Sequence, residues 1–165
     1  MSNIPTLYLI AGHTGAGKST ISKKMAKELP AFYLSHDELL AIAYGDLIGQ
    51  LDFRECCDRM DKLIWRQANQ LFDLKIDLIL EGFGTREMRE GVKQEAEKIG
   101  FHYQLIWVDC PVDERLRRVR ERNQNLNDEG YFISDEDFYR MEKANENLTA
   151  DENAQIIDNS KVLAD

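Results

Sequence analysis

Nine consecutive residues near the start of the chain have the types and spacing of a loop that binds phosphate groups. Glycines permit a tight backbone curl, and the curl turns successive N–H groups inward into a nest for nucleotide phosphates. The lysine of this pattern reaches the β- and γ-phosphates, and its serine hydroxyl binds Mg²⁺. We therefore predict nucleotide binding by the run Gly12, His13, Thr14, Gly15, Ala16, Gly17, Lys18, Ser19 and Thr20.

Asp37 is a candidate for the chemistry that follows binding. It comes three residues after the apolar run 31–34, which predicts a short strand. A hydroxyl that accepts a phosphoryl group must lose its proton, and in a loose transition state a carboxylate can position the hydroxyl and take the proton late. The simpler alternative is an aspartate in the first turn of a helix, where a negative charge is favourable.

Glu81 is the candidate partner of the metal ion, because it ends the apolar run 76–80. A carboxylate at that position can hold the water shell that Mg²⁺ usually keeps. Glu81 could instead contact the acceptor or cap the next segment. Asp109 ends a later predicted strand and is a weaker candidate for the same metal role, since an aspartate before Cys-Pro is often only a turn former.

A basic segment over 112–123 predicts a helix with arginines on one face. Arg115, Arg118 and Arg122 are spaced at i, i+3 and i+7 and so share a helical face. Guanidinium groups on one face suit a triphosphate whose charge spreads during transfer. The adjoining run 125–130 is rich in turn formers and predicts a lid that closes over the nucleotide, with Arg118 and Arg122 in it. The alternative is a solvated face paired at short helical spacing. The segment contains Arg115, Arg117, Arg118, Arg120 and Arg122.

Two further arginines, Arg86 and Arg89, open the predicted helix that follows Glu81. They could bind the acceptor or a phosphate, and they could equally be ordinary surface residues. The spacing favours neither interpretation.

Strands and helices alternate along the chain, and this order must position the candidate side chains. Alternation predicts an α/β fold with a parallel sheet covered on both faces, in which ligands bind at the carboxyl ends of the strands. The glycine loop, Asp37, Glu81 and Asp109 all follow strands, so we expect them at one edge. The predicted strands are 6–11, 31–34, 76–80, 103–108 and 154–158, and the predicted helices are 19–29, 35–44, 53–72, 85–99, 112–123 and 135–145.

Length and composition bound the remaining possibilities. The 165 residues suffice for one domain, spanning 1–165, and 43% of them are hydrophobic. A net charge of −9 disfavours a general nucleic-acid surface, which is usually basic, although a short nucleic-acid end in a local basic pocket stays possible. The apolar runs are too short to cross a bilayer, so we expect no membrane association.

The three cysteines, Cys56, Cys57 and Cys110, are too few and too irregularly placed for a disulfide framework. Without a C-x-x-C pair or clustered histidines, a structural metal site is not expected. A reducing cytoplasm is the simplest location for such a chain.

Taken together, these motifs resemble the P-loop kinases that include polynucleotide kinase, chloramphenicol phosphotransferase and the zeta-toxin kinases. They are more closely similar to a bacterial family of AAA-type predicted kinases or ATPases. The similarity extends over nearly the whole chain and is carried by Gly12–Thr20, Ser35-His36-Asp37-Glu38-Leu39, Tyr44-Gly45, Gly82-Phe83, Arg86, Arg89, Asp109-Cys110-Pro111, Arg118-Val119 and Arg122-Asn123.

This resemblance implies a three-layer P-loop NTPase sandwich with five parallel strands, the loop strand central, and a small helical lid at about residues 113–135. It also implies ATP and Mg²⁺, with Asp37 as the acceptor's base and two lid arginines, Arg118 and Arg122. The chain departs from the pattern at Leu40, where polynucleotide kinases carry arginine. It departs from the closer family at Gly84, where an aromatic residue is usual, and at Glu81, where aspartate is usual.

The sequence thus predicts an ATP-dependent kinase that moves the γ-phosphate of ATP to a hydroxyl group of a small molecule. Its candidate catalytic residues are Lys18, Asp37, Arg118 and Arg122, and its candidate metal ligands are Ser19 and Glu81. One alternative is a nucleotide-binding switch or ATPase without a phosphoryl acceptor, and another is a polynucleotide 5′-hydroxyl kinase. The identity of the acceptor and the oligomeric state stay open.

Overall fold

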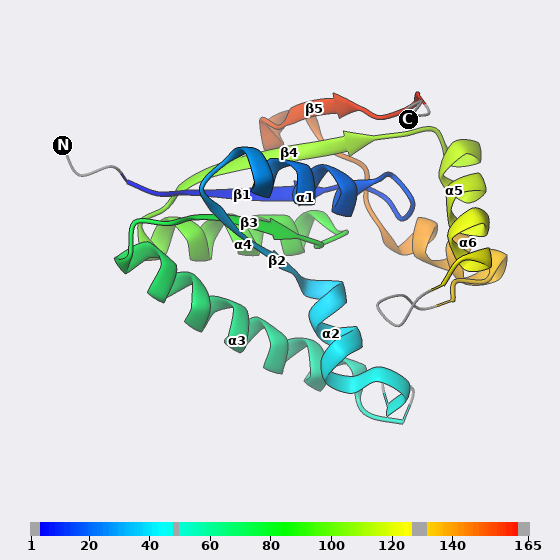
Figure 1. Ribbon diagram of the computed structural model, residues 1–165, viewed down its shortest axis with the longest axis horizontal. Helices are drawn as coiled ribbons and strands as arrows, with labels where there is room; N and C mark the ends of the chain where they lie inside the picture. The colour runs from blue at the N-terminus through cyan, green and yellow to red at the C-terminus, as the bar shows by residue number, and fades with distance from the viewer. Residues whose placement is uncertain (1–3, 48–49, 127–131, 162–165) are drawn as a thin grey trace.

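A five-stranded parallel sheet forms the centre of the molecule (Figure 1). The structure is a computed structural model that describes residues 4–47, 50–126 and 132–161. The strands are β1 (Thr6–Ala11), β2 (Ala31–Ser35), β3 (Asp77–Glu81), β4 (His102–Asp109) and β5 (Gln155–Asp158). They lie in the order β2-β3-β1-β4-β5, and each neighbouring pair is parallel. The predicted α/β class with a central loop strand is therefore confirmed.

Helices connect the strands, and hydroxyl side chains cap the N-termini of several of them. Ser35 accepts a hydrogen bond from the backbone N–H of Glu38, and Thr85 accepts one from Met88, so each caps a free helix N-terminus. Gly100 ends one helix in the left-handed conformation that glycine allows. The helices are α1 (Lys18–Glu28), α2 (His36–Tyr44), α3 (Phe53–Asp73), α4 (Arg86–Ile99), α5 (Val112–Gln124) and α6 (Asp135–Ala144), with short 3₁₀ turns at Gly45–Leu47 and Ala150–Glu152.

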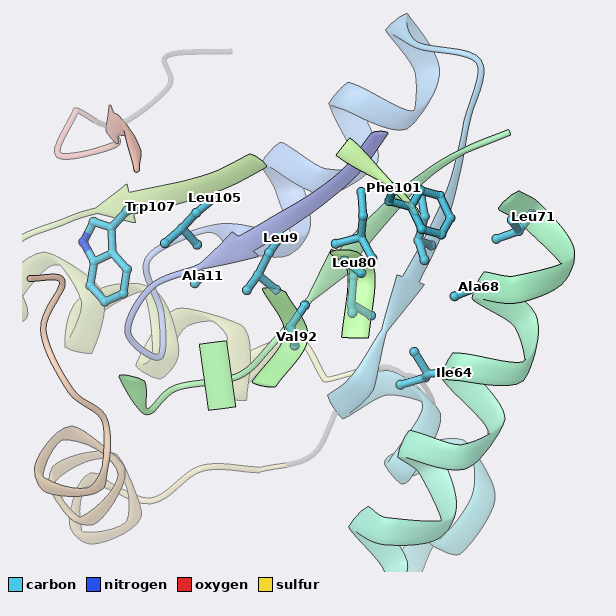
Figure 2. Close-up of a cluster of buried hydrophobic side chains, with 13 residues drawn as sticks. Leu9, Ala11, Ile64, Ala68, Leu71, Leu80, Val92, Phe101, Leu105 and Trp107 are labelled. Atoms are coloured by element: carbon cyan, nitrogen blue, oxygen red, sulfur yellow. The ribbon is translucent and has the colours of Figure 1, made fainter. Parts of the chain in front are cut away.

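One face of the sheet is covered by α3 and α4. Apolar residues recur every three to four positions along α3, so they form a single stripe that packs on the strands. Full burial of one such leucine or isoleucine contributes about 1.5–3 kcal/mol. Figure 2 shows this core, which includes Leu9, Ala11, Ile64, Ala68, Leu71, Leu80, Val92, Phe101, Leu105 and Trp107.

The opposite face is covered by α1, whose Ile21 and Met25 pack on a second cluster of buried strand residues. The sheet is thus covered by helices on both faces, as the near-continuous apolar strands require. Because β1 is the central strand and α1 follows it directly, the loop between them has the sheet on one side and a helix start on the other.

The α5 and α6 helices pack against each other beside the carboxyl ends of the strands (Figure 1). Leu116 and Val119 of α5 contact Phe138 of α6, with Ile133 between the helices in sequence. This pair covers most of the predicted lid at 113–135. Residues 127–131, which include most of the predicted turn-rich run 125–130, lie outside the described residues, so the lid stays a prediction.

Cys56 and Cys110 are buried, Cys57 is half-buried, and all three are free thiols. Within the described ranges, no helix is both long enough and apolar enough to cross a membrane.

Candidate functional site

A cleft of about 440 Å³ opens at the carboxyl ends of the strands, between the glycine loop, α2 and α5. It brings together the predicted side chains of Lys18, Ser19, Asp37 and Glu81 with both predicted lid arginines. Three residues of the predicted loop, Gly12, His13 and Ala16, do not line it. The lining consists of Thr14, Gly15, Gly17, Lys18, Ser19, Thr20, Lys23, Ser35, Asp37, Glu38, Ala41, Glu81, Arg118, Val119, Arg122 and Ile133.

The loop ends at Gly17, which is the residue before α1 and has the left-handed backbone conformation (φ 94°). A Cβ atom at this position would lie 2.3 Å from Nδ2 of Asn159, so a side chain does not fit. No side chain caps the helix here. The first N–H groups of α1 therefore face the cleft without a capping oxygen, which is the arrangement that binds anions at helix N-termini.

Lys18 turns back over the loop, where its Nζ donates a hydrogen bond to the carbonyl oxygen of His13 at 3.1 Å. Burial lowers the pKa of this ammonium group, while the nearby carboxylates of Asp37 and Glu81 act in the opposite direction. The lysine thus lies among the groups that a phosphoryl transfer site needs, with its charge held by two carboxylates.

Ser19 and Glu81 meet directly. The Ser19 hydroxyl donates a hydrogen bond to Oε1 of Glu81 at 2.7 Å, and Glu81 is only 4% exposed. The Tyr33 hydroxyl donates to the other carboxylate oxygen, Oε2, at 2.6 Å. Burial and this carboxylate raise the pKa of Tyr33, so the phenol stays a donor. A hydroxyl beside a fixed carboxylate offers the hard oxygen ligands that Mg²⁺ prefers.

The weaker metal candidate, Asp109, does not line the cleft. It ends β4, and its backbone carbonyl accepts a hydrogen bond from Asn159 at 2.8 Å. Its neighbourhood is therefore the β5 side of the loop and not the pair formed by Ser19 and Glu81.

Asp37 reaches the cleft from the first turn of α2, with 58% of its side chain exposed. Loss of solvent around this carboxyl raises its pKa, but the hydrogen bond with His36 and the charge of Lys18 lower the pKa by more. His36 lies between two carboxylates, with Nδ1 3.7 Å from Asp37 and Nε2 3.4 Å from Asp61. Burial lowers the pKa of His36, yet the two carboxylates raise it to about 9. Asp37 is consequently an ionised group in contact with solvent.

The two predicted lid arginines have different surroundings. Arg118 donates to Glu114 at 2.8 Å, to the carbonyl of Asn159 at 2.8 Å and to that of Ala16 at 3.4 Å. Arg122 lines the cleft one turn further along α5, and its guanidinium has no hydrogen bond or ion pair within the described ranges. Arg118 therefore helps to position the loop, whereas Arg122 keeps its donors for a ligand.

Arg115 shares the sequence spacing of those arginines but turns away from the cleft. It is 4% exposed and binds both oxygens of Glu142 at 2.6 and 2.8 Å, while its Nε donates to the carbonyl of Cys110 at 2.9 Å. Nδ1 of His13 lies 3.1 Å from the same Glu142, and Nε2 of His13 lies 2.8 Å from Asn147. Arg115, Glu142 and His13 thus tie the loop to α5 and α6.

Sequence reasoning missed Glu142 and Asn147 because they lie 27 and 134 residues from their partners. No short-range spacing links such positions. The signal that was available is the histidine inside the loop, since a polar side chain that is 9% exposed needs partners.

Arg89 is also a buried structural residue. It is 1% exposed, binds both oxygens of Glu152 at 2.6 and 2.9 Å, and donates to the carbonyls of Gly84, Glu146 and Asn147. Arg86 pairs with Asp151 at the surface. Neither arginine lines the cleft. Arg86 is an ordinary surface residue, whereas the burial of Arg89 fits neither interpretation that its spacing allowed.

Comparison with known proteins gives the same fold and a family. The profile of a family described as an AAA domain matches residues 7–148. The shikimate kinase of Chromohalobacter salexigens is 29% identical over 134 residues, which cover 76% of this chain and 68% of that protein.

Two solved structures have the same architecture. A candidate kinase from Chloroflexus aurantiacus superposes with a TM-score of 0.73 at 19% identity, over 95% of this chain and 89% of that one. A chain of the Pnkp1/Rnl/Hen1 RNA repair complex superposes with a TM-score of 0.68 at 20% identity, over 86% of this chain and 44% of that one. At these identities the similarity concerns the fold alone, which is that of the P-loop kinases.

Proposed function

The chain belongs to this AAA domain family, within the P-loop kinases, and from that premise we propose that it transfers the γ-phosphate of ATP to a hydroxyl group of a small molecule. The relatives named as kinases support a P-loop phosphotransferase. The hydroxyl acceptor, the catalytic residues and the use of Mg²⁺ are parts of the proposal.

One observation carries the proposal. The cleft combines the groups that phosphoryl transfer requires, contributed by different strand ends: a glycine loop with Lys18, a hydroxyl–carboxylate pair in Ser19 and Glu81, and a second carboxylate, Asp37, at its open side. A nucleotide-binding protein needs the first two. The exposed carboxylate on the acceptor side adds a proton acceptor for a hydroxyl group, which nucleotide binding alone does not require.

The phosphate end of the site is formed by the loop and α1. The free N–H groups at the start of α1 and the Lys18 ammonium would hold the β- and γ-phosphates. Ser19 and Glu81 would hold Mg²⁺ and its waters, and a bound ion would neutralise negative charge on the phosphates. Arg122, which has no partner among the described residues, would donate to the oxygens of the transferred group, on which charge spreads in the transition state.

The acceptor end depends on Asp37. The acceptor oxygen forms a bond to the γ-phosphorus while the bond from that phosphorus to the β,γ-bridging oxygen breaks and ADP leaves. Asp37 orients the acceptor hydroxyl and receives its proton late in the transfer. The lowered pKa of Asp37 keeps it ionised and able to accept that hydrogen bond at neutral pH.

A direct test measures ADP release from Mg·ATP in the presence of nucleosides, sugars, antibiotics and RNA 5′ ends. We expect one class of acceptor to accelerate turnover, and Asp37→Asn to slow the accelerated reaction by about 10²–10⁴-fold, as removal of a general base usually does. Binding of Mg·ATP to this variant should be retained. If no acceptor accelerates ADP release and Asp37→Asn leaves the rate unchanged, the proposal is wrong.

A further inference from the structure

We propose that the phosphoryl acceptor of this protein is a hydroxyl compound that carries no anionic group. The inference rests on the proposed function and deepens it, because it names the charge class of the molecule that Asp37 would activate. It follows from where the cations of the molecule lie and which carboxylates already hold them.

An anionic acceptor needs cationic partners of its own. Carboxylates and phosphates are bound in proteins by arginine forks or by lysine, and a desolvated anion without such a partner is costly. The described cations that line the cleft are Lys18, Lys23, Arg118 and Arg122. Lys18 belongs to the phosphate loop, while Arg118 holds Glu114 and three backbone carbonyls. A bound triphosphate would therefore use the available positive charge of Lys18 and Arg122 at the phosphate end of the cleft.

On the acceptor side, Lys23 and Glu38 line the cleft together and form an ion pair with an Nζ–Oε1 distance of 2.9 Å. His36 is the other cation in this region, and it lies between Asp37 and Asp61. Two cations in this region, Lys23 and His36, are therefore paired with three carboxylates, those of Asp37, Glu38 and Asp61. The side that would receive the acceptor has no surplus positive charge, and its most exposed charged group is the negative Asp37.

The arginines that follow β3 cannot supply the missing charge. Arg89 is buried, and Glu152 and three carbonyl groups satisfy its donors. Arg86 is held by Asp151, while its backbone N–H donates to Glu146 at 2.6 Å. These contacts bind both guanidinium groups to the segment after α6, away from the lining of the cleft.

Two other parts of the chain, the undescribed stretches and the start of α3, also lack a cation for the acceptor. The stretches 48–49 and 127–131, which are not described, contain neither lysine nor arginine in the sequence. Arg54 shares a helical face with Asp61, seven residues further along α3, but it does not line the cleft. The charged groups left for an acceptor are carboxylates, whose oxygens accept hydrogen bonds from hydroxyl or amine groups.

The charge class can be tested without knowing the acceptor. Small molecules extracted from the source organism are separated on an anion-exchange resin at neutral pH, which retains carboxylates, phosphates and oligonucleotides. Each fraction is added to the full-length protein with Mg·ATP, and ADP formation is measured. We expect acceleration by the fraction that passes through the resin. Acceleration by the retained fraction alone would overturn the charge inference and leave the kinase proposal intact, whereas no acceleration by either would overturn the proposed function itself.

A matched pair of variants tests the charge of the acceptor independently. Ala41 lines the acceptor side from α2, and both Glu and Gln are good helix formers of nearly equal size. For the active fraction, we expect the apparent KM of Ala41→Glu to be no more than about threefold above that of Ala41→Gln, since the new carboxylate does not repel a neutral or cationic acceptor. An anionic acceptor would be repelled, and its KM in Ala41→Glu would rise about tenfold or more over Ala41→Gln. Equal affinity of both variants for Mg·ATP is the control.

Discussion

The buried arginines of this molecule and the arginine at the open end of the cleft have opposite surroundings. Arg89 and Arg115 are 1% and 4% exposed, and each holds both oxygens of a carboxylate and donates to backbone carbonyls. Arg118 and Arg122 both line the cleft, but Arg118 is held by Glu114 and backbone carbonyls, whereas Arg122 keeps its donors free within the described ranges. All four come from α4 or α5, close to the loop that would hold the phosphates.

The difference shows how one residue type serves two purposes. A buried guanidinium whose donors are all satisfied fixes the segments that supply its partners, and its removal leaves an unpaired buried carboxylate. Arg89 fixes the segment that presents Asn147 to His13, and Arg115 fixes α6 against the loop. An unpartnered guanidinium in a cleft contributes little to the fold and is available to an anion. Substitutions should therefore separate stability from turnover.

The largest effect is expected in the buried set. Arg89→Leu leaves Glu152 buried without its partner, and loss of one member of a buried ion pair costs about 3–5 kcal/mol of the free energy of unfolding. Arg86→Leu is the matched control, because its pair with Asp151 is exposed and such pairs contribute about 0–1 kcal/mol. Urea unfolding of both variants measures the difference. Equal losses would contradict the structural role assigned to Arg89.

Arg122 should respond in turnover and not in stability. Arg122→Gln removes the donor that we propose contacts the transferred group, and loss of one such donor slows turnover about 10²–10³-fold. Its unfolding free energy should stay within about 0.5 kcal/mol of the parent, as for most surface substitutions. Arg120→Gln is the control, because Arg120 lies two residues earlier in the helix, pairs with Asp135 and does not line the cleft, so turnover should stay near the parental value. A destabilised Arg122→Gln, or equal turnover in both variants, would place Arg122 in the structural set.

The buried set also predicts a dependence of stability on acid. The hydrogen bonds from Arg89, together with those from the backbone and hydroxyl of Thr149, lower the pKa of Glu152 from 4.5 to about 2. A lowered pKa means that the stabilisation is present in full above about pH 4.5 and is lost as the pH falls toward 2, in total about 3 kcal/mol. Unfolding measured between pH 5 and pH 2 should therefore be less steep with pH in Glu152→Gln than in the parent. Identical slopes would show that this carboxyl is not held by Arg89.

The smallest effect concerns the position of Glu81. Tyr33→Phe removes the hydrogen bond to Oε2 while Ser19 still holds Oε1, and one such bond to a charged group contributes about 1.5–3 kcal/mol. Because part of that is regained by water, we expect about a two- to tenfold rise in the Mg²⁺ concentration needed for half-maximal turnover. The KM for ATP at saturating Mg²⁺ should change less. A fall in kcat with an unchanged Mg²⁺ dependence would mean that Tyr33 only supports packing.

Much of the fold could be predicted from the sequence because its signals are local. Ser35 and Thr85 are residue types that cap helices, and α2 and α4 begin directly after them. The apolar stripe of α3 predicts a helix over 53–72, and the observed helix is Phe53–Asp73. The alternation of elements predicts the parallel sheet. The central place of β1 came from the resemblance to P-loop kinases, since strand order depends on contacts distant in sequence.

The sequence predicts the residues of the candidate site, but it does not predict which arginines line the cleft and which are held by structural partners. The motif and the strand ends indicate Lys18, Ser19, Asp37 and Glu81, and the structure brings these into one cleft. The spacing of Arg115, Arg118 and Arg122 places all three on one helical face and cannot tell them apart. What separates them is the position of Glu142 and of other partners far along the chain, which no local pattern encodes.

The central claim is that this cleft passes a phosphoryl group to a hydroxyl and not to water. It is tested most directly with ATP carrying ¹⁸O on its γ-phosphate, incubated with the protein and the metabolite extract and followed by mass spectrometry. The account predicts a labelled phosphorylated compound with the parent chain, none with Lys18→Ala, and about 10²–10⁴-fold less in the same time with Asp37→Asn. Label found only in inorganic phosphate would contradict it and would identify the protein as an ATPase or a nucleotide-binding switch.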